Sequence, residues 1–337
     1  MGLRYYIIRR LFLVVPVLFG LSIVTFVVSH LVPGDPVKLA AGPQAKPEEI
    51  QRLTEEFGLD KPLVIQYLNY MKGLFQGNLG RSMLNHHLVR DDLVKYFPAT
   101  LELVLVSMAF AIVIGIPAAV LAALYRDRWP DQVSRIVALS GISMPLFWLA
   151  IMLQLILGQW LRLLPISGRF DPRLPYPKEI TGLLLLDTFL LGDLKGFFVA
   201  LKYIFLPALT QSLIALALIM RLLRADILEV LQRDFVRMAR ANGIPERIIL
   251  FKYVLKNGLI ATVSMLGFLF GFLLGGSVMV ETVFNWPGLG LYSMNSALSL
   301  DFQPIMGITL FVGLLFTLVN LATDLMYGVL DPRIRYG

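Results

Sequence analysis

The segment from Arg224 to Asn257 concentrates polar residues that could do chemistry in an otherwise apolar chain. Arg233, Arg237 and Arg240 recur at spacings of four and three, so they share one face of a predicted helix. Guanidinium groups bind carboxylates through paired hydrogen bonds, which suits such a row to an acidic surface. The row therefore predicts contact with a charged partner rather than a catalytic step.

A turn divides this segment into two predicted helices. Asn242-Gly243 tolerates the left-handed backbone that ends a helix, and Pro245 suits the start of the next one. Apolar residues form a stripe on another face of the first helix: Leu228, Leu231, Phe235 and Met238. Two interpretations stay open, namely a hairpin lying on anionic lipid and a helix pair that docks into a soluble partner.

Other chemistries find little support in the residues. The chain has no cysteine, which excludes disulfides and thiolate chemistry. His86 and His87 are adjacent and lack a third ligand at a recognisable spacing, so no metal site is predicted. The pattern G-x4-G-K-[ST] does not occur, so the chain cannot itself hold ATP phosphates in such a loop.

The composition indicates a protein that spans a membrane several times. Hydrophobic residues make up 57% of the 337 positions and charged residues only 16%, against about a quarter charged in soluble domains. The net charge of +7 lies in short segments between apolar runs, which disfavours nucleic-acid binding. Six runs are long enough to cross a bilayer: 11–32, 99–125, 133–161, 204–224, 258–281 and 305–328.

Basic residues in the short connections predict the orientation. The N-terminus, the connection 126–135, the segment 225–257 and the C-terminal tail 331–337 are rich in arginine, whereas 282–303 contains no Lys or Arg. Both termini are therefore expected in the cytoplasm. The long segments 33–98 and 162–203 are expected outside, and the first contains two helix-like runs, from Pro47 to Phe57 and from Val64 to Leu74.

Several residues within or beside the spans are candidates for a transport pathway or a gate. Met144-Pro145 predicts a kink in the third span. Gly267, Gly271 and Gly275 lie four apart in the fifth span, where they favour close helix packing or line a pathway. Trp286-Pro287-Gly288 predicts a tight external turn, with the tryptophan either at the membrane interface or in a gate.

Two rival classes of membrane protein are disfavoured by the same residues. An intramembrane enzyme needs paired catalytic groups at membrane depth, and no such pair is evident. An ion-coupled secondary carrier keeps functional carboxylates inside its spans. The span carboxylates here are few and lie near helix ends, at Glu102, Glu281 and Asp324. The energy for any transport is therefore expected to come from another subunit.

Several motifs along nearly the whole chain resemble the permease subunits of binding-protein-dependent ABC importers, specifically the dipeptide and oligopeptide (peptide/nickel) B-type subfamily. The stretch from Asp234 to Gly243 resembles the cytoplasmic "EAA" loop of these permeases. Further motifs occur in the same order as in that family: 31–36, 57–62, 77–82, 275–290 and 331–335. Arg237 and Lys256 differ from the general EAA pattern but are similar to the peptide subfamily.

The resemblance implies an all-α fold of the type I ABC importer permease, with six transmembrane helices in a bacterial cytoplasmic (inner) membrane. It implies a second homologous permease, two ATPase subunits and an extracytoplasmic solute-binding protein as partners, besides membrane lipid. ATP and Mg²⁺ would be used by the ATPase subunits, and this chain would bind no cofactor, hold no metal and perform no catalysis. The residues expected to couple to the ATPases are Asp234, Arg237, Ala239, Arg240, Ala241, Gly243 and Pro245.

The pathway or gating candidates are Met144, Pro145, Gly271, Gly275, Glu281, Trp286, Pro287 and Gly288. Three units are expected: 1–95 with the first span and an external helical segment, the permease core 96–330, and the tail 331–337. The expected substrate is a short peptide of the dipeptide type. Oligopeptides, glutathione, haem and nickel chelates stay open, because selection in this family occurs largely in the binding protein.

Overall fold

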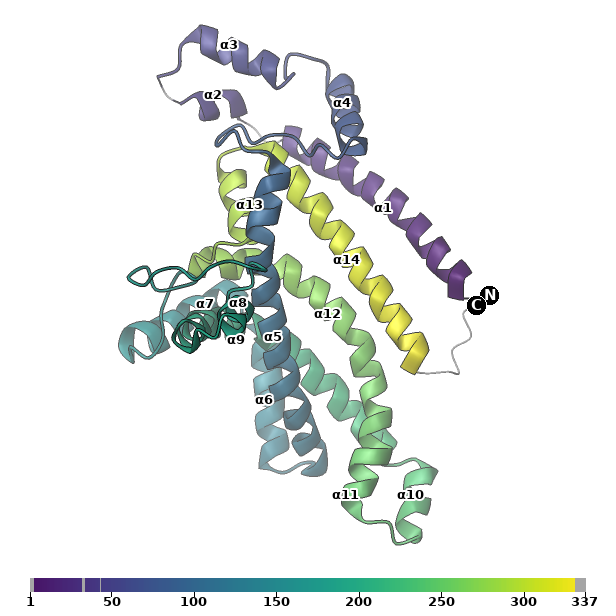
Figure 1. The fold of residues 1–337 in the computed structure, drawn as a ribbon. Coiled ribbons are helices and arrows are strands. Elements are labelled where there is room, and N and C mark those ends of the chain that lie inside the picture. Colours follow the sequence, from purple (N-terminus) through teal and green to yellow (C-terminus); the bar gives the residue numbers. More distant parts are fainter. Residues whose placement is uncertain (1–2, 32–33, 43, 331–337) are drawn as a thin grey trace.

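The computed structural model describes residues 3–31, 34–42 and 44–330, and within these ranges every regular element is a helix apart from one bridge between Arg81 and Leu88. The helices α2, α3 and α4 gather at one end of the elongated chain, and α10 and α11 lie at the other (Figure 1). We name these the outer end and the inner end, following the orientation predicted from the charges. The predicted cytoplasmic tail 331–337 lies outside the described residues.

Five of the six predicted crossings are confirmed as continuous helical runs, and the third corresponds to a bent pair of helices that together reach the length of a span. The bent pair is α6 (Trp129–Ser143) followed by α7 (Leu146–Leu153) and the π-helix η1 (Gln154–Trp160), with an angle of 111° at the break. Met144 and Pro145 occupy that break, where the kink was expected. The continuous runs are α1 (Leu3–Leu31), α5 (Val89–Leu124), α9 (Leu194–Val230), 246–284 ending in α12 (Leu255–Phe284), and α14 (Phe302–Leu330).

Two of these helices extend well beyond the apolar runs that predicted them. α5 begins at Val89 rather than at residue 99, and its first turn carries Asp91 and Asp92, which favour a helix N-terminus. α9 begins at Leu194, and the side chain of Asp193 caps its start by accepting from the Gly196 amide. Asp91 and Asp92 in α5, and Lys195 and Lys202 in α9, interrupt the apolar runs from which the spans were predicted.

The core lies where α5, α9 and α12 pack against one another. Leu216 and Ile219 of α9 are buried together with Leu269 and Leu273 of α12. Gly115 of α5 lets the α9 backbone and Ile219 approach closely, since an added Cβ would lie 3.2 Å from the Ile219 side chain. α1, by contrast, packs on α14 and exposes a broad apolar surface that suits lipid contact.

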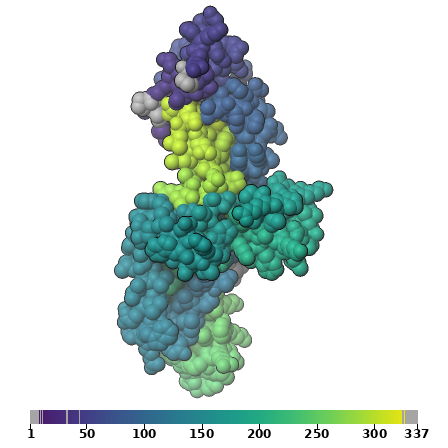
Figure 2. Space-filling model, turned by 90° about the vertical axis from the view of Figure 1, so that its left-hand side faces the viewer, coloured from purple at the N-terminus to yellow at the C-terminus, as the bar shows by residue number. Residues whose placement is uncertain are grey.

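The outer segment contains α2 (Pro36–Ala41), α3 (Pro47–Glu56) and α4 (Leu63–Phe75), which confirms the two helices predicted there. It forms a separate lobe above the crossing helices (Figure 2). Tyr67, Met71 and Leu74 of α4 pack with Phe26 of α1 and Phe302 of α14. The lobe is therefore fixed to the outer ends of the first and last crossings.

The second outer segment runs from 161 to 193 and contains the short helix α8 (Leu184–Leu190). The side chain of Asp187 organises the loop before this helix, because it accepts hydrogen bonds from Ile180, Thr181 and Gly182. Burial alone would raise the pKa of Asp187, but these hydrogen bonds bring the pKa below its ordinary value.

The proposed division of the chain at residue 95 falls within α5, which continues through that position without a break.

Candidate functional site

The inner end projects the helix α10 (Asp234–Ala241), which the sequence assigned to coupling. Val236 and Ala239 are its buried residues, and they belong to a buried cluster with Ile227 of α9 and Ile249 and Val254, which follow the turn. The four residues of the predicted apolar stripe do not share one helix, because Leu228 lies in α9 and Leu231 is its C-cap. Only Phe235 and Met238 lie on α10, where they are 42% and 68% exposed. Two small buried residues three apart fix α10 to the body and leave larger apolar side chains facing outward.

The turn after α10 is a Schellman motif. The Gly243 amide donates to the Arg240 carbonyl at 2.9 Å, and the Ile244 amide donates to the Ala239 carbonyl at 3.2 Å. Gly243 has φ of +72°, which side-chain-bearing residues rarely adopt. An added Cβ would meet nothing within 4 Å, so glycine is needed here for the backbone and not for space within the chain.

After the turn the chain returns through α11 (Glu246–Ile248) and the π-helix η2 (Ile249–Val254) into α12. The restart at Pro245-Glu246 was predicted from the sequence. Of the seven coupling candidates, Ala239 is buried and the other six are exposed: Asp234, Arg237, Arg240, Ala241, Gly243 and Pro245. The exposed six therefore form one continuous surface at the tip of the inner end.

The arginine row at the inner end is paired within the chain. Arg240 binds Glu246 across the turn at 2.7 Å, and Arg237 lies 3.6 Å from Asp234. The side chains of this second pair are 71% and 98% exposed. Such exposed pairs contribute little stability and exchange readily with other carboxylates, so Arg237 can meet an acidic partner.

A buried carboxylate that the sequence did not reveal ties the inner ends of α6 and α9 together. Asp131 has no exposed surface and accepts from Arg224 of α9 at 2.6 and 2.8 Å and from Arg135 at 2.7 Å. The Asp127 amide adds a further bond at 2.9 Å. The only sequence signal for this cluster was the acid-to-arginine spacing of four between Asp131 and Arg135.

Between the outer lobe and the inner end, a second buried carboxylate holds the turn that joins α12 to α13 (Leu289–Leu298), here called the outer turn. Glu281 is fully buried; it accepts from the Thr100 hydroxyl at 2.7 Å and from the Leu291 amide at 3.0 Å. The Thr100 oxygen in turn accepts from the Leu289 amide at 2.8 Å. An added Cβ at Gly288 would lie 2.5 Å from both side chains, so only glycine fits beside this pair.

Trp286 completes this outer turn. Its side chain is 1% exposed, and its indole N–H donates to the Ala99 carbonyl at 2.9 Å. The guanidinium of Arg169, from the second outer segment, lies 5.7 Å from the centre of its ring. The tryptophan is thus a buried anchor between α5, α12 and the outer segment, and does not belong to an interfacial aromatic belt.

Arg169 also forms a buried ion pair with Glu102 of α5. Its guanidinium donates to Glu102 Oε2 at 2.6 and 3.1 Å and to the Gly182 carbonyl at 2.7 Å. The Leu185 amide donates to the other carboxylate oxygen at 2.6 Å. This pair fastens the segment 161–193 to the membrane helices, and sequence reasoning missed it because the partners lie 67 positions apart.

The structure separates the pathway candidates into three groups. Glu281, Trp286, Pro287 and Gly288 lie together at the outer turn, and Met144-Pro145 lies at the α6–α7 break. Gly271 contacts the Phe316 ring of α14, which favours its role in helix packing. Gly275 is exposed, and a Cβ added to it would meet nothing within 4 Å.

Within the described ranges, no three His, Asp or Glu side chains gather into a possible metal site.

Together, the crossings, the two outer segments and the projecting inner helix define a multi-pass membrane protein with a docking element at its inner end. The family described as binding-protein-dependent transport system inner membrane component matches residues 115–336, and its N-terminal counterpart matches residues 3–104. The chain therefore belongs to this family. It is a permease subunit of an ATP-binding-cassette importer in a bacterial inner membrane, and it acts with ATPase and binding-protein partners.

Curated relatives share this length and organisation. The "Probable D,D-dipeptide transport system permease protein DdpB" of Escherichia coli is 42% identical over 329 residues, covering 98% of this chain and 97% of the relative. The dipeptide transport system permease protein DppB of Alkalihalophilus pseudofirmus is 40% identical, covering 98% and 99%. The glutathione transport system permease protein GsiC of Escherichia coli is 37% identical with the same coverage.

A solved structure shows the same fold. An inward-facing conformation of the MetNI methionine ABC transporter superposes with a TM-score of 0.51 at 19% identity, covering 71% of this chain and 96% of that chain. At this identity the likeness concerns the fold alone. It confirms the predicted type I importer permease architecture.

Proposed function

We propose that this permease subunit imports dipeptides by alternating access, driven by ATP hydrolysis in separate subunits. The observation that carries the proposal is the surface at the tip of the inner end, where α10 and the Gly243 turn project beyond the crossing helices. A rigid turn with exposed Phe235 and Met238 and an exchangeable arginine suits a groove on a soluble subunit. The dipeptide assignment is supported by relatives at 40–42% identity that carry dipeptide names.

The coupling step follows from the way that α10 is mounted. Its buried face contacts η2 and shares one buried cluster with residues of α5 and α9, so a push on the exposed face would be transmitted to the start of α12 and to this cluster. Coupling of this kind needs a packed connection between sites rather than a flexible one. Asp234, Arg237, Ala241 and Gly243 would contact the ATPase, whereas Ala239 would act from beneath by fixing the helix.

The proposed complex contains this chain, a second homologous permease, two ATPase subunits and one external binding protein. ATP and Mg²⁺ would be held by the ATPase subunits, and this chain would contribute no catalytic group and bind no cofactor. The two outer segments offer the area on which a binding protein could seat. The outer turn at Glu281, Trp286 and Gly288 would form part of the gate beneath it.

Glutathione import is the second candidate, because the 37% identical GsiC carries that name. Transport in proteoliposomes decides between the two. The complete complex, with ATP on the α10 side, should accumulate labelled dipeptide on that side only when binding protein is present on the other. Export, or uptake that needs no binding protein, would refute the importer mechanism. Uptake of glutathione, a nickel chelate or haem without dipeptide would keep the mechanism and discard the substrate.

A further inference from the structure

A cavity of about 580 Å³ lies between α6 and α9, near the inner ends of both helices. Four arginines line it: Arg126, Arg135, Arg221 and Arg224. The other lining side chains are largely apolar and include Leu139 and Ile142 of α6. Because α6 runs from the inner end into the membrane, these two residues lie about one to two turns deeper than Arg135. The cavity thus joins a basic end to an apolar wall.

A buried carboxylate fixes the basic end of this cavity in place. Asp131 has no exposed surface, and it accepts from Nε and Nη2 of both Arg224 and Arg135. A guanidinium has five N–H donors, so these bonds leave the Nη1 groups for another acceptor. The four arginines outweigh Asp127 on the lining and Asp131 beneath it, which leaves a net charge of +2. An anion would therefore meet guanidinium groups that are already oriented.

Two aromatic residues mark the level of the cavity in the membrane. Tyr125 and Trp129 flank the connection 126–128, at the end of α5 and the start of α6, and are 44% and 77% exposed. Exposed aromatic side chains at helix ends are typical of the membrane–water interface. The arginines of the cavity thus lie at the cytoplasmic surface of the bilayer, where anionic lipid headgroups attract basic residues.

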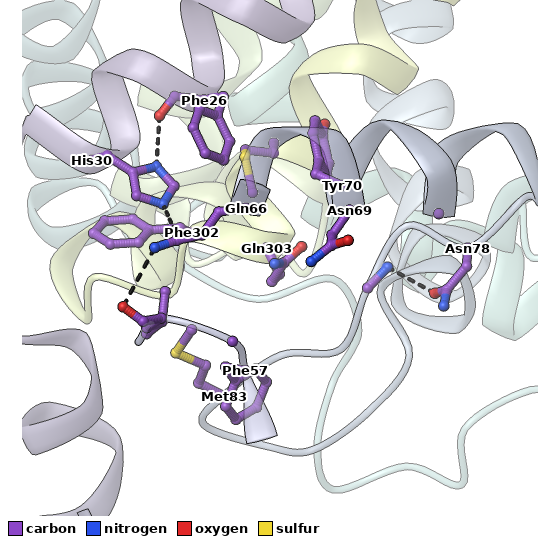
Figure 3. A pocket seen from close by; sticks show the side chains of 15 residues that line it. Phe26, His30, Phe57, Gln66, Asn69, Tyr70, Asn78, Met83, Phe302 and Gln303 are labelled. Atoms are coloured by element: carbon purple, nitrogen blue, oxygen red, sulfur yellow. Dashed lines mark hydrogen bonds between the residues drawn. The ribbon is translucent and has the colours of Figure 1, made fainter. Parts of the chain in front are cut away.

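A cavity at the outer end provides a contrast. Figure 3 shows this space of about 190 Å³ between the outer lobe and the outer ends of α1 and α14. Aromatic rings such as Phe26 and Phe302 and neutral amides such as Asn69 and Gln303 line it, and among the described residues no Lys, Arg, Asp or Glu side chain does. The cavity between α6 and α9 differs because it carries a fixed net charge, so an anion is attracted to it.

We propose that the cavity between α6 and α9 binds an anionic phospholipid of the cytoplasmic leaflet. The phosphate would accept hydrogen bonds from the arginines, which bind phosphate oxygens in pairs. The first part of an acyl chain would lie along Leu139 and Ile142. A free phosphate offers the same charge but has no chain for the apolar wall, so the geometry favours the lipid. This site does not depend on which substrate the importer carries.

The test uses the complete importer in detergent, titrated with dioleoyl phosphatidylglycerol, with the bound lipid counted by native mass spectrometry. Dioleoyl phosphatidylcholine has the same chains and no net charge, and serves as the reference lipid. Arg221→Gln removes a charge from the lining without touching the bonds to Asp131, which come from Arg135 and Arg224. Arg128→Gln is the matched control, because Arg128 is exposed at the same membrane edge and does not line the cavity.

A second pair of variants tests the apolar wall. Leu139 and Ile136 are 70% and 64% exposed on α6, and only Leu139 lines the cavity. Leu139→Ser should therefore weaken the binding of phosphatidylglycerol, whereas Ile136→Ser should leave it within about twofold of native. Both changes replace exposed side chains, so the fold should tolerate them equally.

Phosphatidylglycerol should bind at least about fivefold more tightly than phosphatidylcholine, and Arg221→Gln should weaken it about fivefold, the effect of one basic residue at the surface. Arg128→Gln should change it less than twofold. Equal weakening by both variants would show only a general attraction to the inner surface and would overturn the site. Glycerophosphoglycerol, the headgroup without chains, would overturn it by binding as tightly as the lipid. Displacement of the lipid by alanyl-alanine would also overturn it, since the cavity would then belong to the transport pathway.

Discussion

The turn between α12 and α13 and the tip formed by α10 treat charge in opposite ways. Around the outer turn, Glu102, Arg169 and Glu281 are buried and bound to groups from several elements. At the inner tip Asp234 and Arg237 are exposed, and within the described ranges they pair with one another alone. Buried, fully bonded groups fix a single geometry, whereas exposed pairs exchange partners at little cost. The difference indicates a rigid outer frame and an inner surface kept available for another protein.

The same contrast appears in the turns at the two ends. Gly288 is required because side chains crowd its Cβ position, whereas Gly243 is required by its backbone and faces open space. At the outer turn, the side chains of Glu281 and Thr100 already fill the space beside the glycine. The inner turn presents an empty surface, which is what a docking element needs.

The largest expected effect follows from breaking the buried outer pair. Arg169→Met leaves Glu102 buried without its charged partner, which should destabilise the fold by about 3–5 kcal/mol. Thermal unfolding of the purified permease measures this. The double variant Glu102→Leu with Arg169→Met removes both charges and should recover most of the loss, because a well-packed apolar pair can replace a buried ion pair. An unchanged melting temperature in Arg169→Met would contradict the rigid frame.

The next effect separates the two ends by function. Gly243→Asp strains the backbone and places a charge on the exposed tip, so transport should fall by about tenfold or more, equivalent to roughly 1.4 kcal/mol of lost coupling. The matched control is Gly192→Asp in the second outer segment, where φ is +70° and the Cβ position is also open. Its transport should stay near the native level. Transport at the native level in both variants would mean that 225–257 is only an interfacial hairpin.

A smaller effect concerns pH at the outer lobe. Asp301 accepts from the Ser82 hydroxyl at 2.5 Å and the Met83 amide at 3.1 Å, and burial raises its pKa above the ordinary 3.8 despite these bonds. The neighbouring Asp92 carboxylate raises it further. The folded state therefore holds this proton more tightly than the unfolded state does. Its contribution to stability is full below pH 3.8 and is lost as pH rises through the raised pKa.

Asp301→Asn should remove that dependence. The melting temperature of the native protein, compared with that of the variant, should fall as pH is raised from about 4. Ser82→Ala, which removes one bond to the carboxylate but leaves the acid, should retain the dependence. If the difference in melting temperature between the native protein and Asp301→Asn does not change with pH, the pKa of Asp301 is not raised by folding.

Much of the fold could be predicted from the sequence because the membrane imposes simple rules. Long apolar runs predicted the crossing helices, and Met144-Pro145 predicted the break in the third crossing. The turn at Gly243 followed from its residue types alone. The extensions of α5 and α9 were not predicted from hydropathy, since charged residues interrupt them: Asp91 and Asp92 in α5, and Lys195 and Lys202 in α9.

The candidate sites were less predictable, because they depend on contacts between distant residues. Glu281 and Trp286 were identified, but their partners Thr100 and Ala99 lie more than 180 positions away. The apolar stripe of the inner segment was predicted on one helix, but α9 ends at Val230 and α10 begins at Asp234, so the stripe is divided between two elements. That the small residues Val236 and Ala239 form the buried face of α10 depends on packing with distant parts of the chain, which the spacing of apolar residues does not show.

The smallest expected effect tests whether the arginines at the tip are interchangeable. Arg240 and Glu246 are 45% and 68% exposed, so a double-mutant cycle with Arg240→Ala and Glu246→Ala should give a coupling energy of about 0.2–1 kcal/mol in thermal unfolding. Arg240→Gln should lower transport less than a charge reversal at Arg237, since it removes a charge that Glu246 already partly neutralises. Arg237 has only the weaker contact with Asp234, so Arg237→Glu should lower transport by reversing the charge offered to the ATPase. A coupling energy of several kcal/mol for Arg240 and Glu246 would place a rigid ion pair at the inner tip. The contrast between a fixed outer end and an adaptable inner end would then fail.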